Sequence, residues 1–218
     1  LCGGGGYDAP QGSTFIDDAS GDIYFSSTEK SPLESHLYRI RSDGTGKVRI
    51  TKDDGTHKVT FSPDRRYFVD AYSTRNTLPS LTLYAASGER LATLWETRPD
   101  FLAPYGLTAR EFVTIPAPDG FPIPASILKP ADFNPAKRYP VLIHVYGGPG
   151  SPIVGDRWGR DDLFEHLLVQ QGYVVASFDP RSAAGRSKAL EDPVVGRMMS
   201  DSELADLQAD VKWLKSQS

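Results

Sequence analysis

The hydrophobic period of the sequence changes near Pro104, and this change constrains the fold more than any other feature. Before it, short β-rich runs, such as 21–26 and 36–41, are separated by turn residues. After it, the apolar runs become continuous, at 141–146 and 173–178. Short runs between turn residues are typical of the strands of an all-β fold, and continuous apolar runs are typical of strands buried on both faces. The sequence therefore predicts an all-β half joined to an α/β half.

The first half is predicted to be a series of short strands that continues at 58–61, 67–72, 81–84 and 91–95. A turn followed by an aromatic strand occurs twice, with Tyr24 and Tyr67 about 43 residues apart, which matches the ~40–45 residues of a four-stranded propeller blade. Because two blades cannot close a ring, the missing blades are expected upstream. We therefore expect residues 1–103 to be the C-terminal part of a β-propeller.

The second half is predicted to alternate strands and helices. An antiparallel hairpin is expected at 111–115 and 123–128, and a helix at 163–169 ends near Gly172. A second helix begins at about Ser202 and carries an apolar face made of Leu204, Leu207, Val211 and Leu214. Together with the continuous strands, these elements predict a partial parallel sheet with flanking helices in residues 104–218.

Composition excludes several classes of function. The chain has 24 Lys plus Arg against 28 Asp plus Glu and no basic run longer than two residues, so no nucleic-acid partner is expected. No apolar run approaches the ~18 residues that span a bilayer. The single cysteine, Cys2, rules out an internal disulfide and a cysteine-based metal cluster, and neither a metal nor a cofactor is expected. The cysteine count leaves the compartment open, with a periplasmic or secreted location favoured over a cytoplasmic one.

One segment in the second half resembles a known family. Residues 139–151, ending in Tyr-Gly-Gly-Pro-Gly-Ser, resemble the start of the hydrolase domain in the prolyl oligopeptidase family, and their ending resembles its dipeptidyl peptidase IV branch. Further segments agree with the family in the expected order: 28–34, 61–64, 103–106, 128–133 and 211–217. The resemblance implies a β-propeller followed by an α/β hydrolase domain, and a serine peptidase that acts on peptide substrates. It favours a dipeptidyl peptidase that releases N-terminal dipeptides with Pro or Ala in the second position.

The sequence departs from the family pattern after the second continuous strand. Family members usually have Asp-x-Arg-Gly there, whereas this chain has Asp179, Pro180, Arg181 and Ser182. Replacement of the glycine stiffens a turn beside the expected active site, so the resemblance does not extend to the local shape of this loop.

The serine nucleophile of an α/β hydrolase lies in a Gly-x-Ser-x-Gly elbow, and the Asp and His of the triad follow it. The sequence contains no such elbow. Ser187 lies in a similar segment, but this segment leads into Pro193 rather than into a long helix, so Ser187 is rejected as the nucleophile. We expect the domain to be truncated before the elbow, with the triad outside the chain, and the 218 residues to be inactive alone.

The four histidines are predicted to be structural, because the family's catalytic His follows the Ser. His36 and His57 are expected in strand or loop positions, His144 in the core and His166 on a helix surface.

Tyr146 is the one candidate catalytic residue. Its position at a strand end alone favours packing, but the resemblance assigns its hydroxyl to the oxyanion hole, together with a backbone N–H beside the Ser. Asp156, Arg157 and Trp158 follow it, either in a loop that shapes the site or in an ordinary exposed loop.

Two alternative functions stay open. The parent could be an inactive family member kept as a binding protein, or another α/β hydrolase such as an esterase. The P1 preference, exopeptidase or endopeptidase action, an upstream signal or anchor, the integrity of the triad and the oligomeric state, including a homodimer, are also open.

Overall fold

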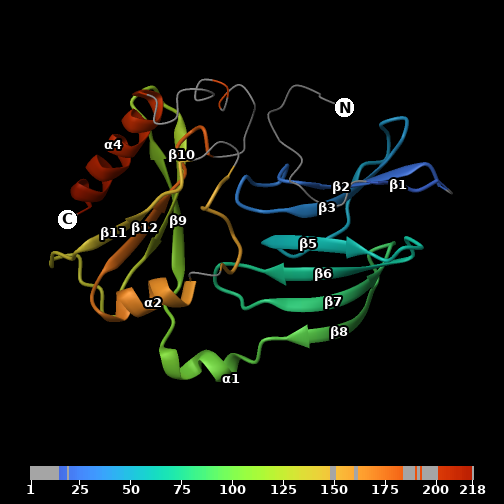
Figure 1. The fold of residues 1–218 in the computed structure, drawn as a ribbon, viewed down its shortest axis with the longest axis horizontal. Helices are drawn as coiled ribbons and strands as arrows, with labels where there is room; N and C mark the ends of the chain where they lie inside the picture. The colour runs from blue at the N-terminus through green and yellow to red at the C-terminus, as the bar shows by residue number, and fades with distance from the viewer. Residues whose placement is uncertain are drawn as a thin grey trace. The chain divides into compact units, whose positions relative to one another are not determined.

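The chain forms two compact units in a computed structural model (Figure 1), which describes residues 15–18, 20–147, 151–159, 162–183, 190, 192 and 201–217. The β unit comprises the described residues up to Phe101 together with Gly155–Trp158. The mixed unit comprises Leu102–Val154 and the described residues from Gly159 onward. The division falls close to the change of hydrophobic period, except for the tetrapeptide Gly155–Trp158.

The β unit consists of two four-stranded antiparallel sheets, each with its strands in chain order. The first contains β1 (Phe15–Ile16), β2 (Asp22–Ser27), β3 (His36–Arg41) and β4 (Val48–Arg49). The second contains β5 (Thr56–Phe61), β6 (Tyr67–Ser73), β7 (Ser80–Ala85) and β8 (Arg90–Glu96). The predicted strands are confirmed. Tyr24 and Tyr67 both lie in the second strand of their sheets, so the 43-residue echo corresponds to one four-stranded sheet.

An aromatic cluster forms the core of the β unit. Its buried members are Tyr24, Leu37, Ile50, Val59, Phe61 and Phe68. Phe15 stacks on Tyr24 with ring centroids 5.0 Å apart and meets Phe61 edge-on at 4.6 Å. Both sheets contribute to this cluster, because alternate residues of β5 point inward. Its packing therefore holds the two sheets together.

The mixed unit contains a four-stranded sheet in the order β11-β12-β10-β9. Its strands are β9 (Arg110–Pro116), β10 (Pro122–Leu128), β11 (Val141–His144) and β12 (Val174–Phe178). The predicted β9–β10 hairpin is confirmed, with Gly120 at φ 87° in the turn. Only the β11–β12 pair is parallel, and β10 pairs antiparallel with both β9 and β12. The sheet is therefore mixed rather than parallel, because a short turn can join only antiparallel strands.

Two helices lie on opposite faces of this sheet, after the short helices α1 (Pro99–Leu102) and η1 (Ala103–Tyr105). Helix α2 (Asp162–Gln170) packs Val169 against Leu128 and Val175. Helix α4 (Asp201–Ser216) packs Trp213 and Leu214 against the other face of the sheet. Both predicted helices are confirmed. None of the helices in the described part of the chain is long and apolar enough to cross a membrane.

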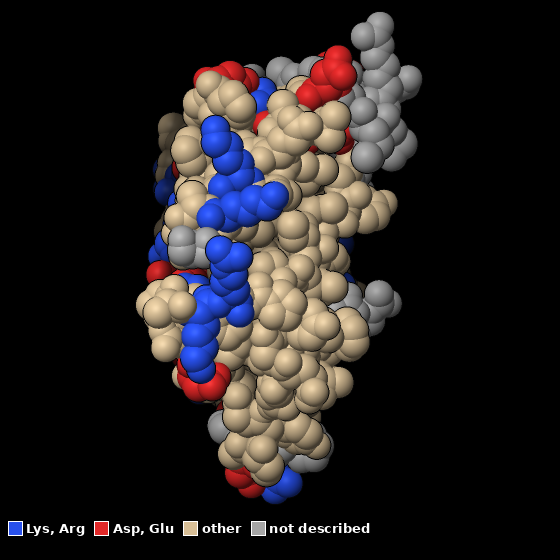
Figure 2. Space-filling model, turned by 90° about the vertical axis from the view of Figure 1, so that its left-hand side faces the viewer, with Lys and Arg blue, Asp and Glu red and all other residues tan. Residues whose placement is uncertain are grey.

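Strand β11 differs from the prediction. All five residues of β12 are buried, as expected, but Val141, Leu142 and Ile143 in β11 are 37–44% exposed. Strand β11 is the edge of the sheet, and within the described residues no strand pairs with its outer side. Figure 2 shows the side of the mixed unit with α4 and β11: it is largely uncharged, with a band of Lys and Arg atoms. The apolar side chains of β11 are therefore exposed, although the sequence predicted that they would be buried.

The buried face of α4 also differs from the prediction. Leu204 and Val211 are exposed, whereas Glu203, Asp206 and Asp210 are buried. The apolar spacing therefore predicted only part of the buried face, since Leu214 packs on the core. Two of the buried acids have partners from distant parts of the chain: Arg181 pairs with Asp206, and the Ser182 hydroxyl donates to Glu203.

Candidate functional site

Tyr146 lies two residues beyond the carboxyl end of β11. Its side chain is 66% exposed, and Gly147, at φ 72°, follows with a backbone conformation that favours glycine. The strand ends at His144, so Tyr146 belongs to the loop rather than to the strand. In α/β sheets, ligands bind outside the carboxyl ends of parallel strands, where this phenol lies. The structure thus places an accessible O–H donor at a position suited to ligand binding.

A network of charged and polar side chains from β9, α2 and β11 includes His144, the last residue of β11. His144 Nδ1 is 3.1 Å from Glu165 Oε1 of α2, and the other oxygen of Glu165 accepts a hydrogen bond from Arg110 of β9. The Arg110 side chain is 2% exposed and lies 3.7 Å from Asp162, whose carboxylate also accepts from the Gly159 N–H. One buried guanidinium therefore links α2 to the first strand of the sheet.

Two histidine predictions are wrong in this unit. The His144 side chain is 40% exposed rather than in the core, because β11 is the sheet edge. His166 is buried at 7% exposure rather than on the helix surface.

A second carboxylate holds the loop that follows Tyr146. Asp179, directly after β12, is 1% exposed. Its Oδ1 accepts from the Ile153 N–H at 2.9 Å and its Oδ2 from the Val154 N–H at 2.8 Å. The Asp179 N–H donates to Pro124 O of β10 at 3.1 Å. This residue therefore connects the loop to the centre of the sheet.

Arg181 joins the loop after β12 to α4. Its guanidinium donates to Asp206 Oδ1 at 2.7 Å and to Asp119 Oδ2 at 2.7 Å, and its backbone N–H also donates to Asp206. The bonds from Arg181 and the Phe121 N–H lower the pKa of Asp119 to about 2. These contacts explain how an acidic face of α4 can be buried.

Ser182 stands where the family usually has glycine. It is fully buried, and its hydroxyl donates to Glu203 Oε1 of α4 at 2.6 Å. The departure from the family pattern is therefore accommodated by a hydrogen bond to the same helix.

Asp210, one turn after Asp206, is fully buried, and neither of its carboxyl oxygens has a hydrogen-bond partner among the described residues. Burial, reinforced by the charge of Asp206, raises the pKa of Asp210 to about 7. Near neutral pH this carboxyl is therefore partly protonated.

The tetrapeptide Gly155–Trp158 is held by loops of the β unit. The Asp156 N–H donates to Leu33 O at 2.6 Å, and Asp156 Oδ1 accepts from the Arg75 N–H at 2.7 Å. The Trp158 N–H donates to Ser73 Oγ at 3.0 Å. Burial raises the pKa of Asp156. The interpretation of Asp156, Arg157 and Trp158 as an ordinary exposed loop is therefore incorrect.

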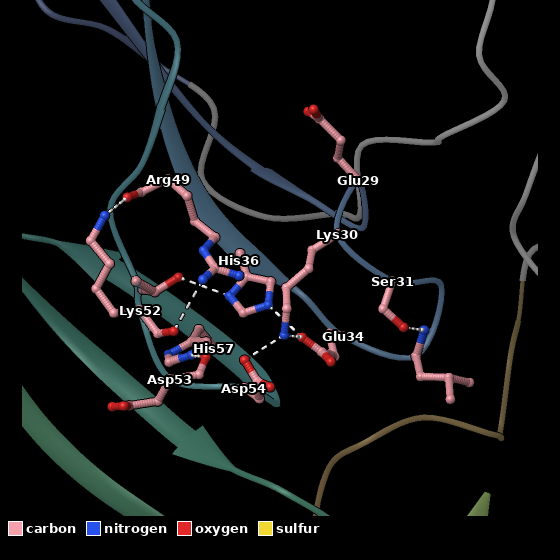
Figure 3. A network of polar contacts seen from close by, with 12 residues as sticks. Glu29, Lys30, Ser31, Glu34, His36, Arg49, Lys52, Asp53, Asp54 and His57 are labelled. Atoms are coloured by element: carbon pink, nitrogen blue, oxygen red, sulfur yellow. Dashed lines mark hydrogen bonds and ion pairs between the residues drawn. The ribbon is translucent and has the colours of Figure 1, made fainter.

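A polar network also lies within the β unit (Figure 3). Lys30 Nζ donates to Glu34 at 2.6 Å and to Asp54 at 2.5 Å, and Glu34 lies 2.7 Å from His36 Nε2. The opposite nitrogen, His36 Nδ1, is 3.2 Å from Thr51 Oγ1. Burial lowers the pKa of His36 against the opposing effect of Glu34.

This carboxylate, imidazole and hydroxyl follow the order of a nucleophilic triad, but the site is structural. Thr51 is 6% exposed and its hydroxyl oxygen already accepts from the Leu37 N–H at 3.1 Å. A substrate carbonyl cannot reach an oxygen so enclosed. The arrangement instead ties the loop before β3 to the loop after β4.

His57 of β5 lies 5.2 Å from the His36 ring. Its Nε2 donates to Asp53 O at 2.9 Å, and its Nδ1 is 2.6 Å from Asp70 Oδ2. Both histidines of the β unit are therefore buried strand residues, in agreement with a structural role.

Across the described residues, no group of His, Cys, Asp and Glu side chains could hold a metal ion. Ser187 lies outside the described residues. The candidate site therefore consists of Tyr146 and the residues that hold its loop.

The known proteins that are similar to this chain are named as dipeptidyl peptidases. A family model for the dipeptidyl peptidase IV (DPP IV) N-terminal region matches residues 4–79. A probable dipeptidyl-aminopeptidase B of Emericella nidulans is 34% identical over 198 residues, which are 88% of this chain and 21% of that protein. Dipeptidyl peptidase 8 of Mus musculus is 29% identical over 212 residues, covering 93% of this chain and 24% of that protein.

A solved structure agrees with these relatives. The crystal structure of Porphyromonas gingivalis dipeptidyl peptidase 4 matches with a TM-score of 0.83 and 31% identity, over 94% of this chain and 29% of that one. The chain belongs to the prolyl oligopeptidase family. Within it, the chain is a dipeptidyl peptidase IV-like segment, which confirms the resemblance found in the sequence. It spans about a fifth to a quarter of the length of these curated relatives.

Proposed function

We propose that the full-length protein carrying this sequence is a serine peptidase that releases dipeptides from the N-terminus of peptide substrates. In this proposal the β unit supplies blades of a β-propeller and the mixed unit is the first part of an α/β hydrolase domain. The names of the relatives and the match to a dipeptidyl peptidase 4 structure support the reaction class. The observation that carries the proposal is Tyr146, an exposed phenol at the carboxyl end of a parallel strand pair.

The chemistry of Tyr146 suits an oxyanion hole. When a serine attacks a peptide carbonyl, negative charge develops on the carbonyl oxygen, and a donor placed at that point stabilises the transition state more than the substrate. A phenol O–H can donate such a bond without carrying a charge of its own. Tyr146 would thus supply one donor, and a backbone N–H near the serine would supply the other.

The edge strand supports the placement of the missing nucleophile. No strand of the described residues pairs with the outer side of β11, and its apolar side chains are exposed, an arrangement that proteins normally cover. A further parallel strand on this side would bring its own carboxyl end next to Tyr146. We propose that this strand leads into the nucleophile elbow.

Finer features of the function are part of the same proposal. We infer a preference for Pro or Ala in the second position, a periplasmic or secreted location, and a homodimer of the full-length protein. These inferences rest on the family resemblance.

Chromogenic peptides test the reaction class. The full-length protein is incubated with Gly-Pro, Gly-Ala and Gly-Leu p-nitroanilides, and with Gly-Pro p-nitroanilide blocked at its N-terminus. We expect rapid cleavage of the first two, little cleavage of the third and none of the blocked peptide. A fluorophosphonate probe should label one serine. Absence of both cleavage and labelling would favour the inactive binding protein, and cleavage of esters alone would favour an esterase.

A further inference from the structure

The residues on both sides of Tyr146 are tied to the end of β12 and the residue that follows it. At the start of the loop, His144 of β11 pairs in parallel register with Ser177 of β12. Beyond Tyr146, the N–H groups of Ile153 and Val154 donate to the carboxylate of Asp179. Ser177 and Asp179 are two residues apart, so His144 on one side of Tyr146 and Ile153 and Val154 on the other are held next to the same end of β12.

The anchor at Asp179 is buried and hydrogen-bonded. Its side chain is 1% exposed, and each oxygen accepts one backbone hydrogen bond of 2.8–2.9 Å. Hydrogen bonds to an ionised carboxylate are stronger than those between neutral groups. The backbone of Asp179 is held in turn by Pro124 of the inner strand β10. Both loop ends are therefore fixed to the best-packed part of the mixed unit.

We propose that Asp179 is a positioning residue that acts through Tyr146. By closing the loop on the end of β12, it fixes where the phenol O–H points, through the hydrogen bonds that its carboxylate accepts from the N–H groups of Ile153 and Val154. This inference rests on the proposed oxyanion role of Tyr146. It predicts that loss of the Asp179 carboxylate lowers activity by displacing Tyr146 and in no other way.

Asparagine is the substitution that best tests this geometry. Asp179→Asn keeps the size of the side chain, but its NH₂ group can only face an N–H of Ile153 or Val154 as donor against donor. One of the two loop contacts is therefore lost while the other can remain. Asp132→Asn provides the matched control, because it makes the same change at an exposed carboxylate of the same unit.

A double-mutant cycle in the full-length protein separates positioning from general damage. Asp179→Asn, Tyr146→Phe and the double variant are compared by kcat and KM on Gly-Pro p-nitroanilide. A displaced catalytic group can cost up to about 10²-fold, so we expect Asp179→Asn to lower kcat at least tenfold with little change in KM. In the Tyr146→Phe background the same substitution should change kcat less than twofold, and Asp132→Asn should have no effect in either background.

The outcomes of the cycle distinguish failure of the positioning role of Asp179 from failure of the oxyanion role of Tyr146. Equal losses from Asp179→Asn in both backgrounds would overturn the positioning role, and so would an unchanged kcat in the Tyr146 background. If Tyr146→Phe alone leaves kcat unchanged, the oxyanion role itself fails, which is a different result.

Hydrogen exchange keeps the inference testable if Asp179→Asn does not fold. In the unsubstituted protein, the backbone amides of Ile153 and Val154 should exchange at least tenfold more slowly than unstructured amides, because both donate to a buried carboxylate. Exchange at the unstructured rate would show that the loop is not held and would overturn the proposal.

Discussion

At the scale of single residues, the ionisable side chains of the mixed unit differ sharply in burial and in hydrogen bonding. Tyr146 is exposed, whereas Asp179 and Asp210 are almost fully buried. Asp179 has two backbone donors, but Asp210 has no hydrogen-bond partner among the described residues. Two carboxyls with similar burial therefore differ in their hydrogen-bonding surroundings.

Tyr146→Phe in the full-length protein should leave folding nearly unchanged, since only a hydroxyl on an exposed ring is removed. If the hydroxyl stabilises the oxyanion, kcat should fall by about 10²–10³. KM should change little, because the bond strengthens only as the carbonyl becomes tetrahedral. Michaelis curves and melting temperatures for both proteins provide the measurement. A kcat within twofold of the parent would instead assign Tyr146 to packing.

Asp210→Asn should alter how stability depends on pH. The pKa of Asp210 is about 7 in the folded state and about 3.9 in the unfolded chain, so between these values the folded state binds more protons. Stability therefore falls as pH rises from about 4 to 7, by up to about 4 kcal/mol, and Asn removes this loss. Relative to the parent, the variant should be more stable at pH 8 than at pH 5.

Melting temperatures across this pH range provide the measurement for Asp210. The control is Asp201→Asn at an exposed position of the same helix. The same pH dependence in the parent and in Asp210→Asn would contradict a buried carboxyl that ionises near neutrality.

At the scale of elements, helix α4 is attached to the sheet by both apolar and ionic contacts. Trp213 and Leu214 pack on the core, while Arg181 binds Asp206 of the helix and Asp119 of the β9–β10 turn. Asp206 is fully buried and Asp119 is 57% exposed, so one guanidinium makes a buried and an exposed ion pair.

Removal of these two carboxylates should have very different effects. Asp206→Ala leaves Arg181 with only the exposed carboxylate of Asp119 as its described ion pair and should lower the free energy of unfolding by about 2–4 kcal/mol, partly offset by relief of repulsion with Asp210. Asp119→Ala is the matched control and should cost less than about 1 kcal/mol, because exposed ion pairs contribute little. Denaturant unfolding of both variants provides the comparison. Equal losses would show that burial does not determine the strength of these pairs.

At the scale of the whole molecule, the described residues include Tyr146 as a donor of the proposed active site, and no strand among them covers the outer side of β11. The apolar side chains of β11 are exposed, and so are Leu163, Phe164 and Leu167 of α2. An exposed edge strand with apolar side chains favours association between chains.

The 218-residue chain produced alone should therefore associate and should not hydrolyse peptides. Half of an oxyanion hole cannot replace a nucleophile and a base. Gel filtration should show assemblies larger than the 23.9 kDa monomer, and Gly-Pro p-nitroanilide should not be cleaved above background. Cleavage that saturates with substrate and scales with the amount of pure chain would overturn this expectation.

The sequence by itself determined most strands of both units, the β9–β10 hairpin, the helices α2 and α4, and the family, whereas the two-residue strands β1 and β4 were not predicted. Short strand runs between turn residues and helical spacing are local signals, and the ordered motifs of the family need no coordinates. Tyr146 was also found this way, since its motif marks it.

Only the tertiary structure decided which groups are buried and what holds them. The buried face of α4 depends on Arg181 and Ser182, about 20 residues or more away in the sequence, and spacing of leucines cannot reveal partners for acids. The exposure of β11 follows from its place at the sheet edge, which is a property of strand order. The contacts of Asp179 with Ile153 and Val154 join segments 25–26 residues apart. The free energy of a buried charge is set by the groups that surround it, and folding brings those groups from distant parts of the chain.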